Sequence, residues 1–116
     1  REFLHVDDFA EACIFVMSLD KEKFLGATNH NHCYINVGSG EEVSINDVVR
    51  ALKNISGFDG EIIYDNSMPD GTKRKLLDST AIKNLGWNST ISLEDGLKKT
   101  YDWFSIHNSI IREIKE

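Results

Sequence analysis

The sequence is poor in the residues that mark special structural classes. It has two cysteines and one proline in 116 residues, and no C-x-x-C pair. This argues against a disulfide framework. Cys13 lies in an apolar helical pattern and Cys33 beside a strand pattern, so we expect both to be reduced core residues of a cytoplasmic protein.

Long apolar runs and positive charge are also scarce. The longest apolar run, residues 12–17, is far shorter than the ~20 residues that cross a bilayer, so we expect no membrane segment. The chain has 13 Lys and Arg against 19 Asp and Glu, a formal charge of −6. Such a chain has no general attraction for a phosphate backbone, which argues against a nucleic-acid partner. Any anion site must be local.

The rest of the composition is that of a globular protein, with 41% apolar and 28% charged residues. At this length we expect one domain, residues 1–116, that buries roughly 65% of the surface of the unfolded chain. The chain begins at Arg1, without an initiator methionine and already within an apolar segment. We therefore expect a piece of a longer protein.

The hydrophobic pattern predicts a mixed α+β fold with about four helices and short strands. Ser44 and Ser92 each precede an aspartate by three residues, the capping-box spacing that begins a helix. Residues 9–19 are apolar on almost every side, which predicts a buried helix. The expected helices are 9–19, 44–57, 79–85 and one from 92 onward; the expected strands are 34–37, 61–65 and 76–77; residues 21–32 are expected to form a loop.

Three possible sites are better explained by structure than by chemistry. His30 and His32 lie in a polar loop and do not supply the three or four fixed ligands of a metal site. The turn 38–40, Gly-Ser-Gly, lacks the remaining residues of a phosphate-binding loop. Asp7 and Asp8 precede a helix and are typical of a cap and a first-turn charge rather than an acid/base pair.

The segment 69–75, Pro-Asp-Gly-Thr-Lys-Arg-Lys, is the strongest candidate binding site. Three of the 13 basic residues stand in consecutive positions of an acidic chain. They indicate either a solvated basic turn or an anion clamp, in which Asp70 could accept hydrogen bonds from sugar hydroxyls. Arg1 is a natural companion, because its planar guanidinium suits a diphosphate.

Several motifs resemble a known family. Arg1 to Asp8, R-E-F-L-H-V-D-D, is similar to a motif of the extended short-chain dehydrogenase/reductases that act on nucleotide sugars. The resemblance to the GDP-L-fucose synthase family within this group rests on four further segments: I-N-V-G-S-G (35–40), P-D-G-T-K-R-K-L-L-D (69–78), L-G-W (85–87) and I-S-L-E-D-G-L with T-Y-D-W-F (91–104). Lys73 stands where the family pattern has proline.

The resemblance implies a C-terminal substrate-binding lobe, with the NAD(P)-binding Rossmann lobe absent from this chain and residues 1–20 including an element that packs on it. The parent enzyme would convert GDP-4-dehydro-6-deoxy-D-mannose to GDP-L-fucose by 3,5-epimerisation and NADPH-dependent 4-reduction. Catalytic and cofactor motifs would lie outside this chain, so no catalytic residue and no cofactor are expected in it. The substrate contacts carried over are Arg1, Asp70 and Lys75. A cytoplasmic homodimer is expected for the intact enzyme.

Two alternatives remain open at this point. One keeps the superfamily but changes the substrate, giving a UDP- or dTDP-sugar epimerase or dehydratase. The other is an interaction module without catalytic function.

Overall fold

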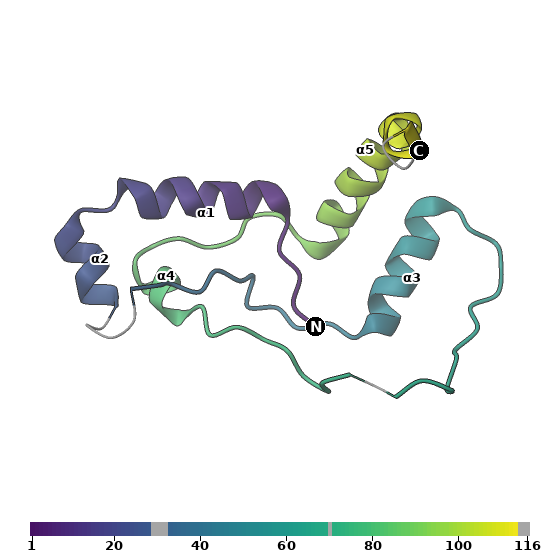
Figure 1. Cartoon of the computed structure of the whole chain (residues 1–116), viewed down its shortest axis with the longest axis horizontal. Helices are drawn as coiled ribbons and strands as arrows, with labels where there is room; N and C mark the ends of the chain where they lie inside the picture. Colours follow the sequence, from purple (N-terminus) through teal and green to yellow (C-terminus); the bar gives the residue numbers. More distant parts are fainter. Residues whose placement is uncertain (29–32, 70, 114–116) are drawn as a thin grey trace.

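The computed structural model describes residues 1–28, 33–69 and 71–113, and its regular elements are helical (Figure 1). They are α1 (Val6–Ser18), α2 (Lys21–Ala27), α3 (Ile45–Ser56), α4 (Thr80–Asn84) and α5 (Leu93–Glu113). None of these helices is both long enough and apolar enough to cross a bilayer. Figure 1 shows α1, α2 and α4 toward one end and α3 with α5 toward the other, joined by extended segments.

The expected strands do not form within the described residues. In the described part of the chain, the segments 34–37, 61–65 and 76–77 are not strands, and the β-pairing is one antiparallel bridge between Glu2 and Glu42. The Asn36 side chain does donate a hydrogen bond to the carbonyl of Asp78, at 3.3 Å, which ties two of these segments together without a ladder. A strand needs backbone partners from a second strand, which local sequence patterns do not guarantee. The α+β expectation is therefore not confirmed.

The helix ends follow local capping chemistry. Ser44 accepts a hydrogen bond from the backbone N–H of Asp47, whose carboxylate accepts one from the Ser44 N–H, so the predicted capping box is confirmed. Gly57 ends α3 in the left-handed conformation, with φ of 66°. Ser92 accepts from the Asp95 N–H at 3.1 Å where α5 begins. α3 and α5 pack against each other.

Residues 21–32 were expected to be a loop, but residues 21–27 form α2. Its one glycine, Gly26, is a weak helix former, and the amphipathic signal of so short a segment is small. His30 and His32 lie outside the described residues. In the described part of the chain, no three His, Cys, Asp or Glu side chains form a metal-binding group.

The core is small and lies where α1 and α4 meet. Ala12, Ile82 and Trp87 are buried together. Partly buried side chains surround them: Leu4, Phe15, Val16, Ile35 and Val37. The Cα radius of gyration is 18.0 Å, above the ~13 Å of a compact domain of this length.

The expectation that α1 is buried on most faces is wrong for this structure. Ile14 is 68% exposed and Met17 85% exposed. Cys13 and Cys33 are free, but both are exposed rather than part of the core. The helical pattern identified apolar positions correctly, but only packing decides which of them are covered.

Candidate functional site

The N-terminal segment forms one wall of the candidate site. The Val43 N–H donates to the carbonyl of Arg1 at 2.8 Å, beside the bridge between Glu2 and Glu42. This pairing places the segment just ahead of α3. Arg1 is thereby held next to the loop that follows position 70, more than sixty residues away in sequence.

A cavity of about 520 Å³ lies between Arg1 and this loop. Its lining is Arg1, Glu42, Val43, Ser44, Ile45, Gly71, Thr72 and Lys73. The Arg1 Nη2 lies 3.6 Å from the position that a Cβ on Gly71 would occupy. The cavity volume falls in the range of small-molecule sites. The lining includes the cations Arg1 and Lys73 and the anion Glu42, whose carboxylate is paired with Arg74, so two basic side chains are available to an anionic ligand.

The three predicted substrate contacts have different outcomes. Arg1 lines the cavity. Asp70 lies outside the described residues. Lys75 is exposed and follows the last lining residue, Lys73, by two positions. The structure brings Arg1 and the basic loop together, and the roles of all three residues stay predictions.

The basic cluster is not uniform. The Arg74 Nε donates to the Glu42 carboxylate at 2.6 Å, and the Arg74 side chain is 70% exposed. This ion pair turns the Arg74 charge toward the protein, whereas Lys73 lines the cavity. Consecutive basic residues in the sequence therefore separate into one paired with Glu42 and one beside Arg1.

Sequence reasoning missed Glu2. Its Oε1 accepts a hydrogen bond from the Gly40 N–H at 2.7 Å, and its Oε2 accepts one from the Leu77 N–H at 3.0 Å. A Cβ on Gly38 would collide with this carboxylate. The turn 38–40 thus encloses a protein carboxylate, and this arrangement does not fit the pyrophosphate of a dinucleotide. No local sequence signal indicates the pairing, because its partners are 38 and 75 residues away.

Asp8 was expected to serve as a cap or first-turn charge, and it does more than that. The N-cap is His5, whose Nδ1 accepts from the Asp7 N–H at 3.2 Å. Asp8 is 1% exposed and accepts three hydrogen bonds from Thr90 and Ile91. Burial alone would raise the pKa of Asp8, but these hydrogen bonds and the neighbouring His5 together hold that pKa below its ordinary value.

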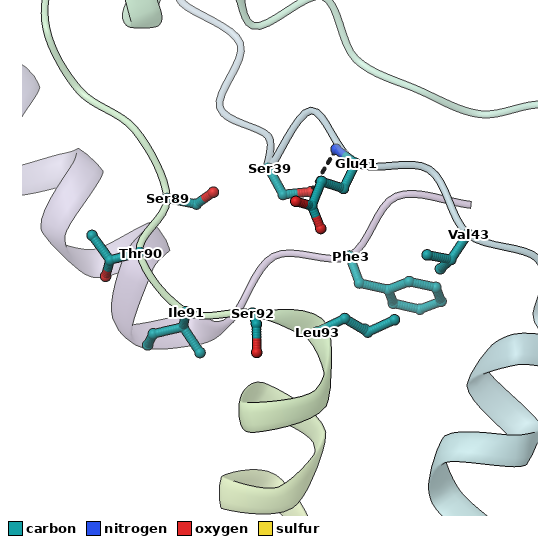
Figure 2. A pocket seen from close by; sticks show the side chains of 9 residues that line it. All are labelled: Phe3, Ser39, Glu41, Val43, Ser89, Thr90, Ile91, Ser92 and Leu93. Atoms are coloured by element: carbon teal, nitrogen blue, oxygen red, sulfur yellow. Dashed lines mark hydrogen bonds between the residues drawn. The ribbon is translucent and has the colours of Figure 1, made fainter.

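A second hollow is lined in part by the N-terminal segment, at Phe3 (Figure 2). It measures about 190 Å³ and is lined by Phe3, Ser39, Glu41, Val43, Ser89, Thr90, Ile91, Ser92 and Leu93. Ser39 accepts a hydrogen bond from the Glu41 N–H at 3.2 Å, drawn as a dashed line in Figure 2. The hydroxyls here have no histidine or lysine among the lining residues to act as a base.

Comparisons with known proteins agree with the motif reading. No protein-family model matches the chain. A GDP-L-fucose synthase of Escherichia coli K12 is 48% identical over 104 residues, which are 90% of this chain and 32% of that protein. GDP-L-fucose synthase 1 of Arabidopsis thaliana is 44% identical over 104 residues, 90% of this chain and 29% of its own length.

Solved structures give the same result for the fold. A GDP-D-glycero-L-gluco-heptose synthase of Campylobacter jejuni, studied in the presence of NADPH, has a TM-score of 0.78 and 36% identity over 90% of this chain and 30% of its own. A GDP-6-OMe-4-keto-L-xylo-heptose reductase of C. jejuni has a TM-score of 0.82 and 38% identity, covering 92% of this chain and 31% of its own.

The chain spans about 29 to 32% of the length of these relatives. The matches run through nearly all of it, so every described helix belongs to the shared region or borders it. The recognition made from the sequence is thereby confirmed, and the chain is a homologue of one segment of the GDP-L-fucose synthases, within the extended short-chain dehydrogenase/reductases that act on GDP-sugars.

Proposed function

We propose that this chain is the GDP-sugar-binding portion of a GDP-L-fucose synthase. The intact enzyme would convert GDP-4-dehydro-6-deoxy-D-mannose to GDP-L-fucose by epimerisation at C3 and C5 and reduction at C4. The main support is the cavity that Arg1 shares with residues 71–73, together with the 48% identity to the bacterial synthase. In this proposal Arg1, Asp70 and Lys75 contact the GDP moiety.

The proposed work of this portion is positioning. Arg1 can donate two parallel hydrogen bonds to a diphosphate, and a lysine adds a point charge. Binding energy collected on the nucleotide, away from the reacting sugar, holds that sugar in place for the chemical steps. Those steps need catalytic side chains, which we assign to the part of the enzyme outside this chain.

NADPH would supply the hydride for the reduction at C4. We place its site outside this chain as well, because the Gly-Ser-Gly turn 38–40 faces the Glu2 carboxylate. The Glu2 carboxylate accepts the Gly40 N–H and fills the space beside Gly38, and the Lys83 ammonium donates to the Ser39 carbonyl at 3.4 Å, so the turn is already occupied by side chains of this chain.

We further propose that residues 1–116 are one C-terminal domain and that residues 1–20 pack on the Rossmann lobe. The support is the apolar face of α1, which we define as Val6, Phe9, Cys13, Ile14 and Met17. These side chains recur at helical spacing and are all exposed. An apolar face of this size is normally covered by a partner surface.

A binding competition on the intact enzyme tests the substrate assignment. We expect GDP to displace a GDP-sugar at lower concentration than UDP or dTDP. Preference for UDP would instead favour a UDP-sugar epimerase of the same superfamily. Failure to convert the GDP-keto sugar with NADPH would remove the synthase assignment altogether.

Sedimentation of the same preparation tests the proposed homodimer, and fractionation of the source cells tests the proposed cytoplasmic location.

A further inference from the structure

The Glu2 carboxylate joins three segments that are distant in sequence. Glu2 stands next to Arg1, its Oε1 is bound to the Gly40 N–H and its Oε2 to the Leu77 N–H. Each carboxylate oxygen therefore has its own backbone partner. A carboxylate is the side-chain group that can accept from two such donors at once without donating.

The backbone around Glu2 is shaped for this contact. Gly38 is buried and leaves the space that a side chain would need, since its Cβ would collide with the Glu2 carboxylate. Gly40 has a φ of 79°, which lets its N–H turn toward Oε1. Gly38 is thus explained by the acidic side chain of Glu2, whereas a Cβ on Gly40 would collide with the Lys83 ammonium.

The contact bears directly on the proposed GDP-sugar site. Leu77 follows Lys75 by two residues, and Glu2 follows Arg1 by one. A hydrogen bond from Leu77 to Glu2 therefore limits how far the Lys75 segment can move away from Arg1. Residues 71–78 are exposed, and the further contacts that tie this range to the rest of the chain include the ion pair of Arg74 with Glu42 and the hydrogen bond from the Asn36 side chain to the Asp78 carbonyl.

We propose that Glu2 is a positioning residue for the GDP-sugar site, holding the loop that carries Lys75 at a fixed distance from Arg1. This inference rests on the proposed function, because it names a residue that serves that same site. Glu2 is not among the residues that line the cavity. A carboxylate beside a site for an anion weakens binding by direct repulsion, so its contribution must come through the two backbone hydrogen bonds.

The test compares Glu2→Gln and Glu2→Ala in the intact enzyme with Glu61→Gln. Glu61 is exposed and its replacement removes the same charge. Glutamine keeps one acceptor oxygen and can therefore keep at most one of the two backbone hydrogen bonds, and alanine keeps neither. Amide hydrogen exchange at residues 76–78 and 38–41 reports whether the Leu77 and Gly40 N–H groups are still hydrogen-bonded. Calorimetry with GDP reports binding.

We expect exchange at residues 76–78 to quicken in both Glu2 variants and the Kd for GDP to rise about tenfold in Glu2→Ala, with a smaller rise in Glu2→Gln. In turnover, KM for the GDP-sugar should rise while kcat stays within about twofold, since the lost contact is with a binding loop. The control should change none of these. Gly38→Ala should act like Glu2→Ala, because the added methyl displaces the carboxylate.

The outcomes separate this inference from the proposed function. Faster exchange at 76–78 with an unchanged Kd for GDP would overturn the positioning role and leave the GDP site intact. Unchanged exchange in both Glu2 variants would show that the Glu2 carboxylate does not hold residues 76–78. A parent enzyme that binds no GDP removes the proposed function, and the exchange data would still report whether Glu2 holds the loop. Should Glu2→Ala fail to fold, Glu2→Gln carries the same comparison.

Discussion

Thr90 donates both its backbone N–H and its hydroxyl to one oxygen of Asp8, at 3.1 and 3.0 Å. The second oxygen accepts from the Ile91 N–H at 3.0 Å. The first turn of α1 is thereby fixed to the segment that leads into α5, 82 residues further along the chain. A buried carboxylate with three donors is a strong structural link, and its removal has measurable consequences.

Asp8→Asn is expected to lower the free energy of unfolding of residues 1–116 by about 2 to 3 kcal/mol. The amide keeps the shape of the side chain but replaces an acceptor oxygen with a donor that faces N–H groups. Urea unfolding followed by circular dichroism measures the change. Asp7→Asn is the matched control, since Asp7 is exposed and should cost less than about 0.5 kcal/mol. Equal losses in the two variants would contradict the structural role of Asp8.

Asp8 also predicts how stability depends on pH. Its pKa is lowered in the folded state, because hydrogen bonds and the nearby His5 outweigh the effect of burial. The unfolded chain therefore binds a proton more readily. The contribution of Asp8 is fully present above the ordinary value of 3.8 and is lost as the pH falls through the lower folded value.

Unfolding curves of the parent chain and Asp8→Asn between pH 6 and pH 2 check this directly. The difference in stability between the two should be constant at the upper end and shrink below about pH 4. A difference that grows on acidification would mean that the sign of the shift is wrong.

Arg1→Ala in the intact enzyme should weaken GDP binding by about 1.5 to 3 kcal/mol, the range for a hydrogen bond to a charged group. Lys75→Ala should weaken it in the same direction. Calorimetry with GDP measures both. Arg50→Ala provides a control, since Arg50 is an exposed cation of α3 that pairs with Asp47 at 3.3 Å. An unchanged GDP affinity in Arg1→Ala would contradict the assignment of this cavity.

Arg74→Ala should behave differently from its basic neighbours. Its guanidinium is paired with Glu42 and largely exposed, so the loss in stability should stay below about 1 kcal/mol. GDP binding should fall less than in Lys73→Ala, because Lys73 lines the cavity. Titration of the two variants with GDP at the same salt concentration compares their affinities. A larger loss for Arg74→Ala would place its charge on the ligand instead.

Replacing glycine by alanine should have opposite effects on stability at two positions. Gly57→Ala should destabilise the chain by about 1 kcal/mol, because Gly57 ends α3 at a φ of 66°. Gly26→Ala should stabilise it by up to about 1 kcal/mol, since Gly26 lies inside α2 and a Cβ there meets no atom within 4 Å. Thermal unfolding of both variants side by side is sufficient to check the signs.

The features that depend on neighbours in sequence were predictable. The Ser44 capping box and the helix end at Gly57 follow from residues within one turn, and the structure confirms both. The motif of residues 1–8 and the segment 69–78 were enough to recognise the homologous enzymes. The short helix α2 was missed, because seven residues with a glycine carry little periodicity.

The sequence alone determined the Ser44 and Ser92 caps, the family and the residues worth testing, because each depends on short spacings or on local chemistry. Tertiary structure decided which charged side chains form hydrogen bonds within the protein and with which partners. Glu2 was not singled out and Asp8 was expected to be a cap or a first-turn charge, but the partners of both lie 38 to 83 residues away and are set by the path of the backbone. Packing likewise left the apolar face of α1 exposed. Strand patterns at 34–37 and 61–65 stayed without ladders, because a strand exists only when a second one lies beside it.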